Sequence, residues 1–341
     1  MSDYKTYILE DKELCYWDDF IIESETGTIF HRIEWLKIAA EHAQMKFIPL
    51  AVKKGNNIVC LFPVFLRKKY GLRILLSPPN RCGVSYLGPA LKIRASNRYN
   101  YEWTFINIVN ELIQYTERKI GFDYFRILHV PGMLDMRPYV WKGYSIQPKF
   151  TYKFDLSGGY EKIYNGFHNV VKNGLKKALN YKDLSISRDI KHAYSILKLA
   201  GKIFSEQNIR FRISNEYFEK LIHSSLSNNI ECLAVVVNGR MISGSINLTD
   251  RNDAYVWVAG VNKEENIPGV GELVLWERIK DYHKRGFIYF DYMDANFERL
   301  CKHKARYGAN LVNYFGVQKK SVKGKIAFEL MNLSNKKLVL S

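Results

Sequence analysis

A glycine-bearing loop in the second half of the chain has the residue types that bind anions. It reads "NIPGVG" at positions 266–271 and lies between an apolar stretch rich in β-branched residues and a segment with helical spacing of apolar residues. The glycines allow a tight turn in which several N–H groups point the same way, and a helix N-terminus formed by such groups binds phosphate. The sequence therefore predicts an anion-binding loop, with a plain strand-to-helix turn as the alternative; its candidate residues are Asn266, Ile267, Gly269, Val270 and Gly271.

Two carboxylates stand at the end of the strand predicted after that helix. Asp291 and Asp294 belong to the stretch "FIYFDYMD". A carboxylate in this place can accept a proton from an attacking amine, and it can equally cap the helix that follows. We take Asp291 as a candidate catalytic base and Asp294 as a candidate substrate-binding residue, with capping as the alternative for both.

A predicted helix over residues 160–182 carries a basic face. Its apolar residues recur three and four positions apart, and most of its lysines lie elsewhere on the helix. Such a face is usually solvated, but it can also hold an anionic substrate such as a nucleotide-linked sugar. Lys172 and Lys176 are the candidates for that role.

The net charge of +17 is the unusual total in a chain of 341 residues. It favours an anionic partner, which could be a nucleic acid, an anionic surface or a phosphorylated substrate, or it reflects a generally basic surface. The first twenty residues are interrupted by charges, and no apolar run approaches the roughly 20 residues of a membrane helix, so we expect a cytoplasmic protein without a transmembrane segment. The five cysteines have no metal-binding spacing, and we expect no metal site.

The elements that must position these residues are written twice. "GFDYF" at 121–125 and "GFIYF" at 286–290 each follow an amphipathic helical segment, so a glycine ends the helix and a strand begins. Upstream of each helix lie three strand-like stretches joined by short turns. Each half thus reads as an antiparallel meander, a helix and a further strand, which predicts an α+β protein built by domain duplication.

The duplication predicts two domains, over residues 1–150 and 151–330, followed by a basic tail at 331–341. A strand near "PKFTYKF" is expected to cross the boundary. The first copy has no G-x-G before its helix. We therefore expect it to keep the scaffold and to have lost the donor site, which leaves one active site per chain.

This order of elements resembles the GNAT acyltransferase superfamily. The superfamily has a pyrophosphate loop, Gln/Arg-x-x-Gly-x-Gly/Ala, between its fourth strand and the next helix. Gly269 and Gly271 match its glycines, and Asn266 stands at its first position. The resemblance implies two tandem GNAT-like domains, each with a mostly antiparallel twisted sheet flanked by helices, and a loop that binds the pyrophosphate of coenzyme A.

Within that superfamily the chain resembles the FemAB-like branch, which has tandem GNAT domains. The basic helix ends in "LKKA" (175–178), like the branch's [IL]-[RK]-K-A pattern, and "HKARYG" (303–308) resembles its F-K-x-x-[FY]-G motif, with histidine at the first position. By this resemblance, Lys304 stabilises charge on the donor and Tyr307 protonates the leaving group. The branch includes peptidoglycan bridge-forming aminoacyltransferases that use aminoacyl-tRNA.

The function that we predict is N-acyl transfer from coenzyme A or aminoacyl-tRNA to an amine, with no tightly bound cofactor. Such a reaction depends on positioning and electrostatic stabilisation more than on a covalent nucleophile, and the sequence has no G-x-S-x-G motif. The acceptor is a small molecule or a cell-envelope precursor, and tRNA is a possible partner. The alternative is a non-catalytic basic protein of the same fold that binds RNA or an anionic surface.

Overall fold

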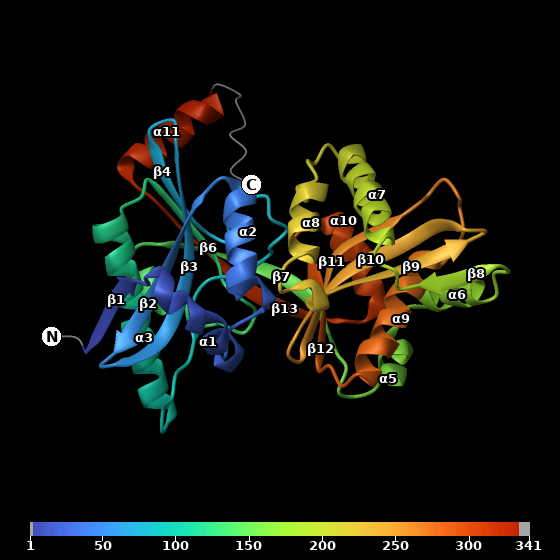
Figure 1. Cartoon of the computed structure of the whole chain (residues 1–341), viewed down its shortest axis with the longest axis horizontal. Coiled ribbons are helices and arrows are strands. Elements are labelled where there is room, and N and C mark those ends of the chain that lie inside the picture. The colour runs from blue at the N-terminus through green and yellow to red at the C-terminus, as the bar shows by residue number, and fades with distance from the viewer. Residues whose placement is uncertain (1–2, 334–341) are drawn as a thin grey trace. The chain divides into compact units, whose positions relative to one another are not determined.

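The computed structural model describes residues 3–333, and the chain divides into two compact units (Figure 1). The first unit comprises the chain up to Lys149 together with the segment from Asn313 onward, and the second comprises Phe150–Val312. The sequence had placed residues up to 330 in the second domain, whereas the segment from Asn313 groups with the first unit. Of the expected tail, residues 334–341 lie outside the described part of the chain.

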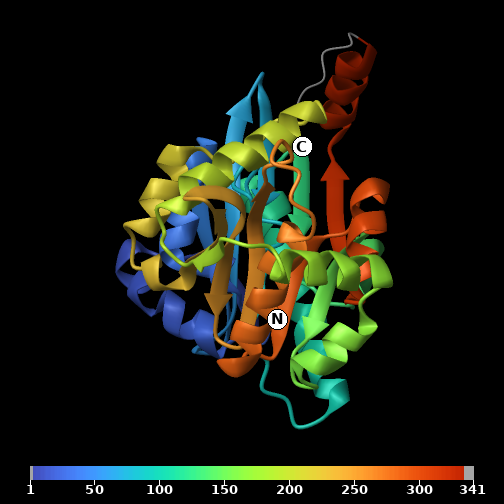
Figure 2. The same cartoon turned by 90° about the vertical axis from the view of Figure 1, so that its right-hand side faces the viewer.

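The first unit has a mostly antiparallel sheet with the strand order β1-β2-β3-β4-β6-β13, in which β4 and β6 are parallel and the short β5 pairs with β3. Its strands are β1 (Tyr4–Ile8), β2 (Lys46–Lys54), β3 (Asn57–Lys69), β4 (Leu72–Ser77), β5 (Ala90–Leu91), β6 (Tyr124–Leu128) and β13 (Asn310–Lys320). Its α-helices are α1 (Trp17–Glu23), α2 (Ile33–Ala43), α3 (Arg98–Tyr115), α4 (Arg137–Trp141) and α11 (Val322–Leu333). Figure 2 shows β13 leading into α11.

The second unit has the strand order β7-β12-β11-β10-β9-β8, and its only parallel pair among the described strands is β11 with β12. Its strands are β7 (Ser145–Asp155), β8 (Leu184–Ser187), β9 (Ile230–Val237), β10 (Arg240–Asp250), β11 (Asp253–Val261) and β12 (Tyr289–Asp294). Its helices are α5 (Tyr160–Gly166), α6 (Asn169–Leu179), α7 (His192–Glu206), α8 (Asn215–Ile222), α9 (Val270–Lys284), α10 (Glu298–Lys304) and the 3-10 turn η5 (Ala305–Tyr307).

The two units repeat one order of elements. In the first, the meander β2-β3-β4 leads through α3 to β6, which lies parallel to β4; in the second, β9-β10-β11 leads through α9 to β12, which lies parallel to β11. Gly121 and Gly286, which follow the two helices, have φ of +69° and +84°, as a helix stop at glycine requires. The predicted α+β duplication is confirmed.

The core of the second unit holds α9 against its sheet. Leu273 and Ile279 of α9 are buried together with Leu233 of β9 and Phe290 of β12. Helix α7 covers β9–β11 as well, on the side of the sheet away from α9 in Figure 1. Burying a large aliphatic side chain contributes about 1.5–3 kcal/mol, so α9 is firmly fixed along its length. No helix within residues 3–333 is both long enough and apolar enough to cross a membrane.

Candidate functional site

The predicted anion-binding loop leads directly into α9. Gly269 is the N-cap residue, with φ of +82°, and Val270 is the first helical residue. The first helical hydrogen bond runs from the Leu273 N–H to the Gly269 carbonyl at 2.9 Å, so the N–H groups of residues 270–272 precede it. Gly269 offers no capping side chain. These N–H groups and the positive end of the helix dipole therefore favour an anion here.

The corresponding helix of the first unit is capped by its own sequence. The Oδ1 of Asn97 accepts a hydrogen bond from the N–H of Asn100 at 2.9 Å, at the start of α3. A side-chain cap satisfies one of the N–H groups that an anion would otherwise use. The two repeats thus differ at the position where the sequence differs.

The two glycines of the loop have different surroundings. An ideal Cβ on Gly269 would lie 1.9 Å from the carbonyl oxygen of Gly174 in α6, whereas a Cβ on Gly271 would have no atom within 4 Å. Gly269 therefore allows α6 and the start of α9 to touch through their backbones. Gly271 leaves open space beside the helix N-terminus. Of the remaining loop residues, Asn266 is exposed and Ile267 packs against the core.

The parallel strands β11 and β12 separate on the way to this loop. Their register contains three pairs and ends at Tyr255 and Asp291. Beyond that point β12 shifts its register and pairs with β7, through Met293–Tyr152 and Asp294–Thr151, while β11 continues to Val261 beside β10. Two parallel strands that part next to an uncapped helix N-terminus leave an edge of β11 to which an extended ligand can bind.

Lys304 points into the protein. Its Nζ donates to the carbonyl oxygens of Tyr292 (2.7 Å), Met293 (2.8 Å) and Asp294 (3.1 Å), which uses all three N–H groups of the ammonium. Burial lowers the pKa of Lys304 to about 8, although Asp294 and Asp291 oppose the shift. These contacts make Lys304 a positioning residue for the end of β12, in place of the direct contact with a donor that the resemblance implied.

The two candidate carboxylates also hold this strand end. Asp291 has 0% of its surface exposed, and its Oδ1 accepts hydrogen bonds from Thr151 Oγ1 (2.6 Å) and the Met293 N–H (2.8 Å). Asp294 Oδ1 accepts from the N–H of Asn296 (3.0 Å) and from its Nδ2 (2.7 Å). The N-cap residue of α10 is Phe297, so neither aspartate caps that helix. Both carboxylates support the shape of the loop after β12.

Tyr307 lies in an aromatic cluster that the sequence did not reveal. It is 2% exposed, and its ring centroid lies 5.5 Å from that of Tyr292 and 5.4 Å from that of His303. Burial raises the pKa of both tyrosines well above the usual range, and the carboxylate of Glu272 acts in the same direction. We call Tyr292, Tyr307, His303 and Glu272 the tyrosine cluster. Its phenols stay protonated at neutral pH and can donate a proton.

Tyr292 and Glu272 were missed as functional candidates. The available signal was position: Tyr292 stands between the two singled-out aspartates, and Glu272 directly follows Gly271. The side chain of Glu272 turns toward α6, since its Oε1 lies 3.5 Å from an ideal Cβ on Gly174. The cluster therefore joins the first turn of α9 to the end of β12.

The candidate lysines of α6 face away from the loop. Lys172 Nζ donates to the Asn165 carbonyl at 2.9 Å, and Lys176 is exposed. Each is two residues from Gly174, which places it about 200° around the helix from the contact with Gly269. Lys177 is three residues from Gly174 and shares its side of the helix. The exposed Lys177 is thus the α6 lysine that flanks the anion-binding loop.

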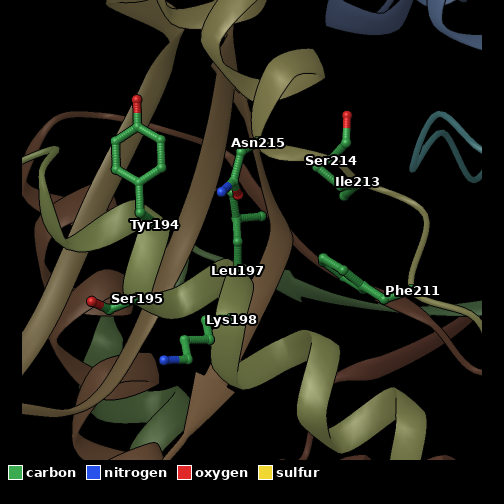
Figure 3. A pocket seen from close by; sticks show the side chains of 8 residues that line it. All are labelled: Tyr194, Ser195, Leu197, Lys198, Phe211, Ile213, Ser214 and Asn215. Atoms are coloured by element: carbon green, nitrogen blue, oxygen red, sulfur yellow. The ribbon is translucent and has the colours of Figure 1, made fainter.

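A surface pocket of the second unit lies apart from these residues. It is formed by α7 and the segment before α8, and Figure 3 shows polar groups of Tyr194, Ser195, Lys198 and Asn215 beside the ring of Phe211. None of the residues singled out in the sequence lines it.

Comparison with known protein families identifies the class of the second unit. Residues 166–304 match the acetyltransferase (GNAT) domain family. The matched segment contains the anion-binding loop, α9, β12 and Lys304. No curated protein matches the chain in sequence. This part of the chain is therefore a GNAT acetyltransferase domain.

Solved structures extend the likeness to the whole fold. FemX aligns with a TM-score of 0.70 at 10% identity, covering 96% of this chain and 99% of its own. L-PGS from Bacillus licheniformis aligns at 0.54 and 10% identity, covering 94% and 96%, and a tandem GNAT protein from the clavulanic acid biosynthesis pathway at 0.53 and 11%, covering 93% and 98%. The predicted tandem GNAT fold and the likeness to the FemAB-like branch are confirmed.

Proposed function

We propose that the chain is an N-acyltransferase whose donor, an acyl-coenzyme A, binds at the N-terminus of α9. The observation that carries this proposal is the uncapped start of α9, with open space at Gly271, beside the point where β11 and β12 part. The pyrophosphate accepts hydrogen bonds from the N–H groups of residues 270–272, and Lys177 supplies a nearby positive charge. The match of this segment to the acetyltransferase family supports the same donor.

The tyrosine cluster supplies the proton chemistry. The amine nitrogen of the acceptor attacks the thioester carbonyl carbon, a C–N bond forms, and the C–S bond breaks. The leaving thiolate takes a proton from the Tyr307–Tyr292 pair, whose raised pKa keeps it protonated. The carboxylate of Glu272, beside the same pair, takes the proton that the amine releases. Lys304 and Asp291 hold β12 in place and do not contact the reacting atoms.

Aminoacyl-tRNA is the second candidate donor, favoured by the net charge of +17 and by the aminoacyltransferases of the FemAB-like branch. The acceptor is an amine of a small metabolite or of a cell-envelope precursor. Mass spectrometry of small molecules that co-purify with the chain would identify either substrate. Product formation from radiolabelled acetyl-coenzyme A with a panel of amines then tests the reaction.

The donor site is tested by ligand-linked stabilisation. A ligand that binds the folded state at a hundredfold excess over its Kd stabilises it by about 2.7 kcal/mol. We expect coenzyme A to raise the melting temperature of the parent chain and to lose this effect in Gly271→Val, because the new side chain fills the open space at the helix start. Lys176→Ala, on the opposite side of α6, is the control and should respond like the parent. Equal stabilisation of the parent and Gly271→Val would mean that the loop is only a turn.

A further inference from the structure

A buried arginine of α9 has hydrogen-bond partners for only part of its guanidinium group. Arg278 is 1% exposed, and its Nη1 donates to Glu231 Oε2 at 3.1 Å. Its Nε and Nη2 are also buried, and neither has a partner within residues 3–333. These two nitrogens share one edge of the planar group, the edge that binds a carboxylate through two parallel hydrogen bonds. Buried donors without an acceptor cost free energy, so an acceptor at this edge stabilises the protein.

Arg278 lines a pocket of about 540 Å³ in the second unit. The size is that of a site for a small organic molecule. The walls come from α9, the start of β9, and the segments that follow β8 and α8. Ile190, Ile222 and Ile230 give the pocket apolar walls. A ligand with an apolar body and one polar end fits this lining.

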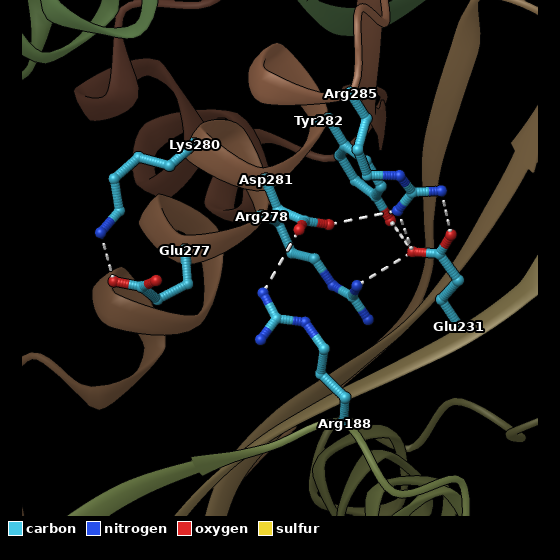
Figure 4. Close-up of polar contacts among 8 residues, drawn as sticks. All are labelled: Arg188, Glu231, Glu277, Arg278, Lys280, Asp281, Tyr282 and Arg285. Atoms are coloured by element: carbon cyan, nitrogen blue, oxygen red, sulfur yellow. Dashed lines mark hydrogen bonds and ion pairs between the residues drawn. The ribbon is translucent and has the colours of Figure 1, made fainter.

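The charges around the pocket leave one positive charge uncompensated. Arg285 forms a forked pair with Glu231, at 2.7 and 3.1 Å, and also reaches Asp281 at 3.2 Å (Figure 4). Arg188 reaches the other oxygen of Asp281 at 3.3 Å. The lining thus has three arginines and two carboxylates. Burial raises the pKa of the Cys232 thiol to about 12, so this residue adds no negative charge.

We propose that this pocket binds a small organic monocarboxylate, whose carboxylate takes the Nε–Nη2 edge of Arg278 and whose apolar body lies against the three isoleucines. One negative charge balances the lining, whereas a phosphate would carry a larger charge and no apolar body.

The pocket is separate from the proposed donor site. Arg278 is eight residues beyond Val270, which places it roughly 12 Å along α9 from the helix start. None of the loop, α6 or tyrosine-cluster residues lines the pocket. The carboxylate site therefore does not depend on the proposed acyl transfer, and the two can fail independently.

Titration calorimetry with three probes at constant ionic strength tests the ligand class. Sodium isobutyrate should bind saturably to the full chain. Isobutyramide, which has the same shape without the charge, should bind at least tenfold more weakly, and inorganic phosphate should bind more weakly than isobutyrate. Absence of saturable isobutyrate binding would overturn the proposal, and tighter binding of phosphate would overturn the carboxylate assignment.

Two variants locate the site. Arg278→Met keeps an apolar stem and should weaken isobutyrate binding at least tenfold, because Glu231 retains Arg285 and Tyr282 as donors. Ser227→Trp, at an exposed position of the lining, should block the pocket without disturbing the core and serves if Arg278→Met does not fold. Both variants should keep the thermal response of the parent to coenzyme A. Unchanged isobutyrate affinity in either folded variant would contradict the assignment.

Discussion

At the scale of single residues, burial decides what a charged side chain does. Lys304 was expected to act on a donor, but its ammonium lies under the surface against three carbonyl groups. An ammonium has three donors and no acceptor, so these carbonyls leave none for a ligand. Each of them belongs to the end of β12, where Met293 has a left-handed φ of +58°. Lys304 therefore stabilises a backbone shape that the chain would otherwise not keep.

The lowered pKa of Lys304 predicts a pH dependence of stability. The pKa is about 8 in the folded chain and close to its ordinary value of 10.5 in the unfolded chain. Between these values the unfolded state binds more protons, so the free energy of unfolding rises with pH, by at most about 3 kcal/mol in total. This contribution is complete above pH 10.5 and is lost as the pH falls through 8. Urea unfolding of the parent and Lys304→Met from pH 7 to 10.5 should show a widening difference in favour of the parent; a constant difference would contradict the assignment.

The two loop glycines should respond differently to alanine. Gly269→Ala forces a Cβ against the Gly174 backbone at a positive φ, and we expect a loss of about 3 kcal/mol or more in the free energy of unfolding. Gly271→Ala adds a methyl group in open space within a helix and should be neutral or stabilising by about 0.5–1 kcal/mol. Unfolding midpoints in urea separate the two. Similar midpoints would mean that α6 and α9 do not touch as described.

The sequence shows these glycines but not the reason for each. A G-x-G spacing predicts a tight turn before a helix, and the structure has one at Gly269. The partner of Gly269 is Gly174, almost a hundred positions earlier and in another helix, and no local pattern connects them. The same holds for Tyr307, whose neighbours come from β12 and α9. Chemistry that depends on contacts between distant elements could not be predicted from spacing alone.

At the scale of elements, the position of a lysine around α6 determines its effect. Lys176 and Lys177 are adjacent in sequence, but only Lys177 lies on the side of α6 that touches the start of α9. We expect Lys177→Ala to weaken coenzyme A binding about three- to tenfold, because it removes one charge near the pyrophosphate. Lys176→Ala should leave the affinity unchanged. Calorimetric Kd values for the two variants test this, and equal effects would mean that the charge acts only as part of a general basic surface.

The elements themselves were largely predictable. Turn and helix-stop residues marked both meanders and both helices, and glycine ended each helix where expected. The parting of β11 and β12 was not predictable, because it depends on β7, whose pairing with β12 draws that strand away from β11. β7 precedes β12 by more than a hundred residues. Strand neighbours at that distance leave no local pattern.

At the scale of the whole molecule, duplication has produced two repeats with different capacity for a donor. Asn97 occupies the N-terminus of α3, while α9 begins at a glycine. We expect one coenzyme A per chain in a calorimetric titration. A stoichiometry of two would show that the first unit has kept a donor site.

The charge of the whole chain yields a test that separates the two candidate donors. The +17 total is spread along the sequence, and the proposed coenzyme A site uses backbone N–H groups and a single flanking lysine. Few ionic contacts to phosphate give a shallow dependence on salt, so log K for coenzyme A should fall with log[NaCl] with a slope of about −1 or less steep. A tRNA that contacts many basic residues would release a counterion at each phosphate, with a slope of roughly −0.7 per contact for single-stranded segments. Titrations of coenzyme A and of unfractionated tRNA at several salt concentrations measure both slopes. Tight, steeply salt-dependent binding of tRNA, together with no measurable binding of coenzyme A at low salt, would replace acyl-coenzyme A with aminoacyl-tRNA as the donor.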